Sequence, residues 1–310
     1  MSKHGWAYLG GKQVPLKEAN VGIMTHALHY GTAVFEGIRG NWNNKKGQMF
    51  VFRLKEHYER LLRGCNIMRI DLPFSVDEYC KITVDLLLKN NFKEDVYIRP
   101  LAFKGAEMVA NLKLHELSDE FALMILPFGS YIDNDRPIKC QTSSWRKPED
   151  TIMPTGVKIT GLYTTSILAK TEAVSAGYDE AILLNNDGTV SEGSGENLFI
   201  VNSGTMSTPC ETDNCLLGIT RDSVIQLAET QLGLKVVQRR IHRSELYLAD
   251  EIFLTGTAAH VTSVGELDNR KISTGKVGQI TEKLQDLYFS TVKGENEKFY
   301  DWCTPITPIN

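Results

Sequence analysis

The sequence predicts a mixed α/β fold (α/β with α+β character) in two domains. Alternating apolar and polar residues recur between stretches of helical periodicity, so strands and helices are interleaved along the chain. The chain has 310 residues, and roughly 150 residues per domain is typical. A polar, turn-prone segment ending in proline, YIDNDRP at 131–137, divides it. We therefore expect a first domain over 1–130, a linker over 131–138 and a second domain over 139–310.

Periodicity and turn residues give the order of elements in the first domain. The apolar residues of 54–68 recur at helical spacing, and Ser75 with Glu78 forms a capping box that begins a further helix. Pro100 has no N–H, so its strand is expected at an edge or rim of a sheet. The predicted elements are a hairpin over 6–16, strands over 33–40 and 48–53, helices over 54–68 and 75–89, and strands over 96–103 and 121–131.

The second domain is also predicted to contain both strands and helices. Gly177 is expected to stop a helix that begins near Tyr163, and Thr220 to cap a helix that ends at Gly233. The predicted elements are a strand over 139–146, the helix from Tyr163, a strand over 180–185, a turn over 186–188, a strand over 189–201, the capped helix, a strand over 251–256 and a helix over 277–292.

Composition argues against several classes of function. Lys and Arg total 34 and Asp and Glu total 38, so the net charge of −4 provides no basic excess for nucleic acid. The longest apolar stretch, FALMILPF at 121–128, is far shorter than the about 20 residues that cross a bilayer. The N-terminal segment lacks the apolar core of a secretory signal, and the six cysteines form no CxxC pair. We expect a cytoplasmic protein with reduced thiols and no membrane partner.

The common motifs of metal and nucleotide chemistry do not occur in the sequence. It contains no HExxH, no Walker loop and no GxSxG, and its seven histidines lack ligand spacing. EGSGEN at 192–197 is not GxGxxG and is not followed by a helix, so a dinucleotide-binding fold is not indicated. We therefore expect no metal site.

Several short segments together fit the needs of pyridoxal 5′-phosphate. This cofactor requires a lysine amine for a Schiff base, a carboxylate that keeps its ring nitrogen protonated, and donors for its phosphate. Backbone N–H groups at a helix N-terminus, hydroxyls and a guanidinium suit the phosphate. Each candidate taken alone also has an ordinary structural explanation.

Lys158 and Glu192 are the candidates for the reactive groups. No other ionisable side chain lies near Lys158 between Asp150 and Tyr163, which suits a partly buried amine. Glu192 follows an alternating strand among small residues that allow a flat ring to approach. A surface lysine at a strand edge and a carboxylate in a turn are the alternative interpretations.

Two turns and an arginine are the candidates for phosphate binding. Residues 218–222 precede a helix whose first-turn amides have no intrahelical acceptor, and residues 255–259 offer hydroxyls and amides without bulk. Arg53 ends a strand next to a helix, where it could be a bidentate anchor. A plain capped helix, a tight turn and a surface ion pair would also explain these features.

Strand parity places aromatic and basic side chains together. In AVFEGIR, Phe35, Gly37 and Arg39 share one face, and in VYIRPLAF, Tyr97 and Arg99 do so. Gly37 permits the close approach of a ligand or of another backbone. An aromatic ring beside a cation suits an acid with an apolar tail, and ordinary packing beside an exposed arginine is the alternative.

Seven segments occur in one order along nearly the whole chain, from about residue 6 to 290. They are HYGTAVFEGIR (29–39), VFRLKEHYERL (51–61), YIRPL (97–101), GVKITGLYTTSILAKTEA (156–173), GYDEAILLNNDGTVSEGSGENLFIV (177–201), GITRDSVIQLA (218–228) and LTGTAAHVT (254–262). In this order the chain resembles the branched-chain amino-acid aminotransferase family of type IV pyridoxal-phosphate enzymes. The resemblance implies a small N-terminal α/β domain and a larger C-terminal domain with a barrel-like mixed sheet, joined by an interdomain loop.

The resemblance also implies a role for each matching residue. Lys158 would be the Schiff-base lysine that moves the proton between the substrate Cα and the cofactor C4′, and Glu192 would pair with the ring nitrogen. The other cofactor contacts would be Arg53, Tyr163, Leu216, Ile219, Thr220 and Thr257. The substrate contacts would be Phe35, Gly37, Tyr97 and Tyr131 at the side chain, Arg99, Ala258 and Ala259 at the carboxylate, and Tyr30 from the partner subunit of a homodimer or higher homo-oligomer.

The implied activity is transfer of the amino group of leucine, isoleucine or valine to 2-oxoglutarate, giving 2-oxo acids and glutamate. Arg39 or Arg99 could receive the γ-carboxylate of 2-oxoglutarate. Three departures from the family pattern concern the substrate range: Phe128 where tryptophan is frequent, the stretch 104–120, and Ser263 where proline is common. An (R)-selective amine or D-amino-acid transaminase on the same fold is the alternative, and a non-catalytic protein that carries the cofactor is a rival of another class.

Overall fold

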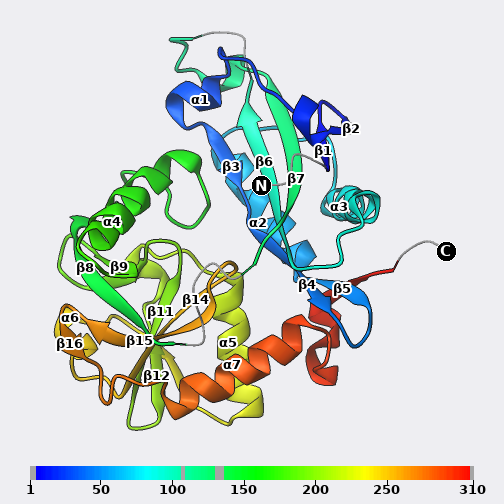
Figure 1. The fold of residues 1–310 in the computed structure, drawn as a ribbon. Helices are drawn as coiled ribbons and strands as arrows, with labels where there is room; N and C mark the ends of the chain where they lie inside the picture. Colours follow the sequence, from blue (N-terminus) through cyan, green and yellow to red (C-terminus); the bar gives the residue numbers. More distant parts are fainter. Residues whose placement is uncertain (1–4, 106–108, 130–135, 308–310) are drawn as a thin grey trace. The chain divides into compact units, whose positions relative to one another are not determined.

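The computed structural model describes residues 5–105, 109–129 and 136–307. These residues form a mixed α/β structure with two sheets, which confirms the predicted fold class (Figure 1). The chain divides into two compact units, the first made of residues 1–129, 157–161 and 290–310 and the second of 130–156 and 162–289. Residues 131–135 of the predicted linker, Tyr131 among them, lie outside the described residues. The domain boundaries inferred from the sequence stay a prediction.

An antiparallel sheet forms the centre of the first unit. Its strand order is β17-β5-β4-β6-β7-β1-β2, and β3 pairs with β6. The strands are β1 (Trp6–Leu9), β2 (Lys12–Pro15), β3 (Ala33–Phe35), β4 (Ile38–Asn43), β5 (Gln48–Phe52), β6 (Val96–Lys104), β7 (Asp119–Pro127) and β17 (Cys303–Ile306). The predicted hairpin, β1 with β2, is therefore confirmed.

Three α-helices of the described residues accompany this sheet, α1 (His26–Tyr30), α2 (Leu54–Ile67) and α3 (Val76–Asn90). The capping box at the start of α3 is confirmed, because Ser75 accepts from the Glu78 amide and the Glu78 carboxylate accepts from Ser75 N at 2.8 Å. α2 buries the apolar face that its periodicity predicts, and the ring of Tyr58 on α2 stacks on Tyr79 of α3 at 5.5 Å.

Two sequence expectations for this sheet are wrong. The predicted strand over 33–40 is interrupted at Glu36 and Gly37, which separate β3 from β4. Pro100 does not lie at an edge, because β6 pairs with β3 and β4 on one side and β7 on the other. The carbonyl of Pro100 accepts from Glu36 N at 3.0 Å. Pro100 therefore faces the interruption between β3 and β4, where its missing N–H leaves no regular ladder bond unmade.

The second unit contains a mixed sheet that curls into a half-barrel (Figure 1). Its order is β10-β9-β8-β15-β14-β11-β12-β13, with β16 paired to β15. The β8 strand runs parallel to β9 and β15, and β12 runs parallel to β13. The strands are β8 (Ile138–Arg146), β9 (Glu180–Leu184), β10 (Val190–Gly193), β11 (Asn197–Asn202), β12 (Thr205–Thr208), β13 (Val236–Gln238), β14 (Glu251–Gly256), β15 (His260–Leu267) and β16 (Arg270–Lys271).

Helices cover this second sheet. They are α4 (Tyr163–Ser175), α5 (Ile219–Gln231), α6 (Arg243–Leu246) and α7 (Gln279–Val292). Gly177 and Gly233 follow α4 and α5 with φ of 87° and 64°, the left-handed conformation expected after a helix end. Thr220 is not the cap of α5, because Gly218 occupies that position and Thr220 lies in the first turn. The predicted strand over 189–201 is divided into β10 and β11 by a turn in which Gly193 N donates to Glu196 O at 2.7 Å.

Three further observations concern residues 5–105, 109–129 and 136–307. None of the helices there combines the length and the apolar run that a bilayer crossing requires. All six cysteines are free thiols. No group of three or more His, Cys, Asp or Glu side chains is gathered in a way that would hold a metal ion in this part of the chain.

Candidate active site

Lys158 lies in a short extended segment of the first unit. Its neighbours Val157 and Ile159 are buried, and its own side chain is half-buried. Its carbonyl accepts from Phe35 N at 3.0 Å, and Ile159 forms a bridge with Val34. The Nζ atom of Lys158 lies 5.7 Å from the centre of the Phe35 ring. The backbone of Lys158 is thus fastened to β3, and its amine lies beside the ring of Phe35, a predicted substrate contact.

The predicted face of aromatic and basic side chains is confirmed. Arg39 pairs with Tyr97 across β4 and β6, so their side chains share a face with Arg99, two residues further on β6. The guanidinium of Arg99 lies 4.4 Å from the centre of the Phe35 ring and donates to the Tyr97 hydroxyl at 3.0 Å. The Nε atom of Arg99 is buried and makes no hydrogen bond within the described residues. The Nε–H group of Arg99 is therefore available to the carboxylate of a bound acid.

Arg39 and Gly37 contact other parts of the first unit. Arg39 is 4% exposed, and its guanidinium donates to the carbonyls of Phe128 and Gly129 at 3.1 and 2.8 Å. A Cβ atom on Gly37 would lie 2.1 Å from the Tyr97 hydroxyl. Gly37 thus makes room for the phenol of Tyr97.

Arg53 stands where the sequence predicts it, between β5 and α2. It is the N-cap of α2, with a left-handed φ of 48°. Its Nε donates to Glu56 at 2.8 Å, and its guanidinium lies 5.0 Å from the centre of the Trp302 ring. These contacts hold a positive charge at the first turn of α2.

Tyr30 occupies the last residue of α1 and is 41% exposed. Its hydroxyl accepts from Ala110 N at 3.1 Å, and its ring lies 4.5 Å from that of His26. Within its own chain it therefore belongs to the surface of the first unit.

In the second unit Glu192, on β10, is buried and held by three donors. Lys147 pairs with Oε1, while Asn197 Nδ2 and Leu216 N donate to Oε2 at 3.2 and 3.0 Å. Lys147 is 5% exposed. The carboxylate is thus an oriented buried anion rather than a solvated turn residue.

Sequence reasoning missed Lys147. Lys147 belongs to no recognisable motif, and only the pairing of strands places it beside Glu192. Lys147 N donates to Leu184 O at 2.9 Å, and Leu184 pairs with Val190 at the start of β10. Only the pairing of β8, β9 and β10 brings these residues together.

Two glutamates of the same segment have opposite environments. Burial, with the neighbouring carboxylate of Glu180, raises the pKa of Glu196 above its ordinary value. Glu192 instead has an ammonium partner. Because Glu196 favours its neutral form, Glu192 is the better counter-ion for a protonated ring nitrogen.

The N-terminus of α5 has the character of an anion site. Ile219 and Thr220 are buried in its first turn, directly after Gly218. The hydroxyls of Thr220 and Tyr288, on α7, are 3.5 Å apart.

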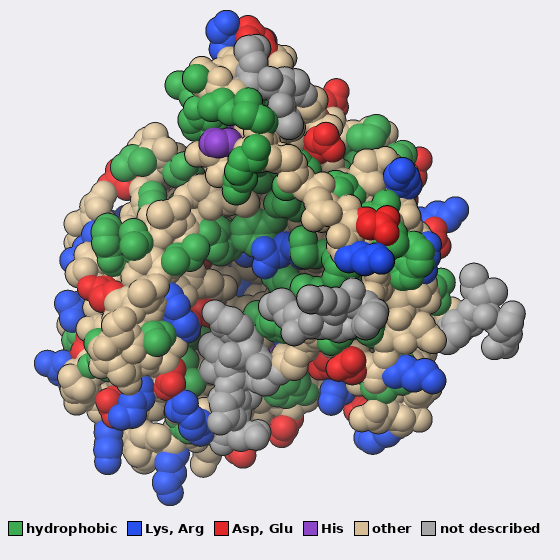
Figure 2. Space-filling model, turned by 45° about the horizontal axis from the view of Figure 1, so that its top comes forward, with side chains coloured by type: hydrophobic (Ala, Val, Ile, Leu, Met, Phe, Trp, Pro, Cys, Tyr) green, Lys and Arg blue, Asp and Glu red, His purple; other side chains and the backbone are tan. Residues whose placement is uncertain are grey.

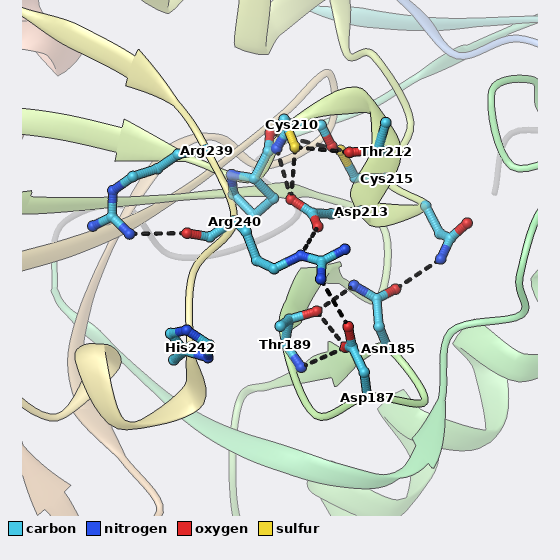
Figure 3. A network of polar contacts seen from close by, with 12 residues as sticks. Asn185, Asp187, Thr189, Cys210, Thr212, Asp213, Cys215, Arg239, Arg240 and His242 are labelled. Carbon is cyan, nitrogen blue, oxygen red and sulfur yellow. Dashed lines mark hydrogen bonds and ion pairs between the residues drawn. The ribbon is translucent and has the colours of Figure 1, made fainter.

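A polar network fixes the loop before α5 (Figure 3). Asp213 is fully buried and accepts from Cys210 N at 3.0 Å and from Arg240 Nε at 3.3 Å. Arg240 also pairs with Asp187 at 3.2 Å, and Asn214 donates to Asn185 at 3.0 Å. The loop that carries Leu216 is therefore anchored to the turn between β9 and β10.

The other candidate cradle is the turn of residues 257–259, between β14 and β15. Gly256 pairs with His260 across it, and Thr262 Oγ1 donates to the carbonyl of Ala259 at 2.8 Å. The Oγ1 atom of Thr255, just before the turn, is buried without a hydrogen-bond partner in the described part of the chain. Such an orphaned hydroxyl is expected where a ligand supplies the partner.

The donor set fits pyridoxal 5′-phosphate. The second unit offers the oriented Glu192 carboxylate, the α5 N-terminus and the orphaned Thr255 hydroxyl, with Tyr163 as the first residue of α4. The first unit offers the Lys158 amine and the Arg53 guanidinium. An amine, a carboxylate, a guanidinium and helix-terminal amides are the groups that this cofactor requires.

Gly218 is expected to be essential for the orientation of Glu192. A Cβ atom there would lie 2.1 Å from Asn197 Oδ1, and Asn197 donates to both Glu192 and Leu216 O. Gly218→Ala should therefore lower the free energy of unfolding by about 1–3 kcal/mol and weaken cofactor binding about tenfold. Denaturant unfolding and a cofactor titration measure both.

Gly22→Ala is the matched control, because a Cβ atom at Gly22 meets no atom within 4 Å and Gly22 has no proposed contact with the cofactor. Equal losses in the two variants would contradict the role given to Asn197.

Comparison with known proteins agrees with this geometry. The model of the family Amino-transferase class IV matches residues 33–267. A probable branched-chain-amino-acid aminotransferase of Aquifex aeolicus is 48% identical over 302 residues, covering 97% of this chain and 96% of the relative.

Solved structures give the same result. The branched-chain aminotransferase of Thermoproteus uzoniensis with norvaline has a TM-score of 0.93 and 42% identity, covering 98% of this chain and 99% of that one. The branched-chain amino acid aminotransferase of Thermobaculum terrenum, in its PLP form, has a TM-score of 0.92 and 37% identity, covering 99% of this chain and 100% of that one. The chain, with its type IV fold and pyridoxal-phosphate donor set, therefore belongs to the class IV aminotransferase family.

Proposed function

We propose that the protein transfers the amino group of branched-chain L-amino acids to 2-oxoglutarate with pyridoxal 5′-phosphate as cofactor. The observation that carries the proposal is the buried Glu192 carboxylate, oriented by Lys147, Asn197 and the Leu216 amide. A carboxylate so placed serves a cationic ring nitrogen. The relatives named for branched-chain substrates support the choice of substrate.

Each of the proposed site residues then has a definite task. When bound, the cofactor supplies an aldehyde and an electron-accepting ring that stabilises the charge left by a broken Cα–H bond. Lys158 would be the group that takes the proton from the substrate Cα and gives it back at the cofactor C4′. Glu192 would keep the ring nitrogen protonated, and Tyr163 would donate to the ring hydroxyl.

The remaining contacts hold the cofactor and the substrate in place. The phosphate is assigned to Arg53, Thr220, Thr257 and the amide of Ile219, with Leu216 orienting Glu192. The carboxylate beside the reacting carbon is assigned to the amides of Ala258 and Ala259. The apolar side chain is assigned to the rings of Phe35 and Tyr97, with Gly37 beside them. Tyr131 is proposed for the same contact and lies outside the described residues. We assign the γ-carboxylate of 2-oxoglutarate to Arg99 rather than Arg39, because the Arg39 guanidinium is engaged by the carbonyls at 128 and 129.

A substrate panel tests this proposal. The purified protein should be yellow, and its cofactor absorption band should vanish with L-leucine, L-isoleucine or L-valine and reappear with 2-oxoglutarate. Faster conversion of D-leucine or (R)-1-phenylethylamine would favour the amine or D-amino-acid alternative. A band that no amino donor changes would favour a protein that only carries the cofactor.

We also propose that the protein is a homodimer, in which Tyr30 reaches the partner's substrate. Large apolar side chains around α1 are exposed, with Ile23 at 75% and Leu28 at 61%. Figure 2 shows such hydrophobic side chains gathered at the top of the view, over this end of the first unit. Exposed apolar area of this kind favours a protein interface. Light scattering should give twice the mass of one chain, and the mass of a single chain would refute the dimer.

The cytoplasm is the compartment that we propose. Six free thiols in one chain, four of them buried, suit a reducing environment.

A further inference from the structure

A buried triad of ionisable side chains lies next to the Lys158 segment. The Oε1 atom of Glu36 accepts from Arg60 Nε at 2.6 Å, and its Oε2 accepts from Arg60 NH2 and His57 Nδ1, each at 2.8 Å. Glu36, His57 and Arg60 are 1%, 2% and 5% exposed. None of the three has a task in the reaction described above.

The three side chains of the triad shift one another's pKa values. Burial alone would raise the pKa of Glu36, but Arg60 and His57 reverse this effect and hold that pKa below its ordinary range. Burial lowers the pKa of His57, and the positive charges of Arg60 and Lys158 lower it further against the opposing effect of Glu36. His57 therefore donates from Nδ1 to the Glu36 carboxylate, and the positive charge of Lys158 acts on the same imidazole.

The triad also connects the elements that carry proposed site residues. Glu36 follows Phe35, whose amide donates to the carbonyl of Lys158. His57 N donates to the carbonyl of Arg53 at 3.3 Å. Glu36 therefore joins the end of β3 to the first two turns of α2.

Gly64 brings the same helix against the lysine segment. A Cβ atom on Gly64 would lie 2.6 Å from Val34 Cγ1 and 3.4 Å from Val157 Cβ. The helix α2 therefore packs closely on both β3 and the segment that carries Lys158, and a displacement of α2 would move both.

We propose that Glu36, His57 and Arg60 are positioning residues for Lys158, which fix its segment against α2 and balance the charge around its amine. The inference rests on the proposed function, because it takes Lys158 as the reactive lysine. A role in packing alone is the alternative, since apolar residues of similar volume stabilise a core at least as well as a buried ion pair.

A positioning role and a role in packing alone predict different shifts of the midpoint of the spectral pH titration. Glu36→Gln removes an anion near Lys158 and disfavours the protonated amine or its cofactor adduct, so the midpoint of the spectral pH titration should fall by about one pH unit. Arg60→Met removes a cation and should raise the midpoint by a similar amount. A disturbed core would move both variants in one direction or not at all.

The experiment titrates the cofactor absorption band of the loaded protein against pH for the wild type and both variants, with kcat and KM for L-leucine. Asp119→Asn is the control, because it breaks another ion pair of the first unit, with the buried Lys104 at 2.5 Å. Its midpoint should stay within about 0.3 units, a margin of about twofold in proton affinity. Shifts of opposite sign in the triad variants support the proposal, and shifts of one sign or unchanged midpoints overturn it.

A second measurement decides the matter if the triad variants do not fold. Electrostatic coupling is reciprocal, so Lys158→Met should raise the midpoint at which His57 titrates in proton NMR spectra of the protein without cofactor. The same midpoint in both proteins, or no titration in either, overturns the proposal. Failure of the proposed function would look different, because the wild type would then show no cofactor band and no transamination.

Discussion

Replacing Lys158 by alanine is expected to reduce transamination by about 10⁴-fold or more. A positioned acid–base group contributes about 10²–10⁴-fold, and the same amine also forms the covalent link to the cofactor. The half-reaction with L-leucine, followed by the loss of the cofactor band, measures the effect. Borohydride reduction of the wild type followed by peptide mapping should place the adduct on Lys158.

Lys45→Ala is the control for this experiment, because the Lys45 side chain is 85% exposed and pairs only loosely, at 3.6 Å, with Glu295. It should leave the rate unchanged. Turnover in the Lys158→Ala protein, or an adduct on another lysine such as Lys147, would disprove the assignment.

The second large effect is expected at Glu192. The Glu192→Gln variant removes the charge that faces the ring nitrogen, so kcat should fall by about 10²–10³-fold, as for the loss of an oriented electrostatic group. It also leaves the buried Lys147 without its carboxylate, which should cost about 3–5 kcal/mol of unfolding free energy. Denaturant unfolding of the protein without cofactor measures the second effect.

The double variant Glu192→Gln/Lys147→Met separates the two effects. Removing both charges of a buried pair is often neutral for stability, so most of the lost unfolding free energy should return while kcat stays low. With the single Lys147→Met variant this completes a double-mutant cycle. Recovery of activity together with stability would show that Glu192 acts only as a partner of Lys147.

Local patterns predicted much of the fold. The helical period of 54–68 and the capping box at Ser75 depend on residues close together in the chain, and both are confirmed. The shared face of Tyr97 and Arg99 follows from the two-residue period of a strand and is confirmed by their hydrogen bond.

Long-range pairing could not be predicted in the same way. The interruption of the strand at Glu36, the central place of Pro100 and the pair of Lys147 with Glu192 all depend on which strands lie side by side. Sequence parity says which face a residue occupies, but the register between strands decides which residues meet. The roles of the site residues themselves stay predictions that the variants above test.

The pairing of β17 with β5 has a consequence for biosynthesis. The first unit takes one edge strand, Cys303–Ile306, from far along the chain, after the whole of the second unit, and takes the Lys158 segment from between two parts of that second unit. A nascent polypeptide therefore cannot complete the first unit as soon as its leading portion has been translated. Until residues 303–306 emerge from the ribosome, the edge of β5 has no permanent neighbour, and an unprotected strand edge invites aggregation.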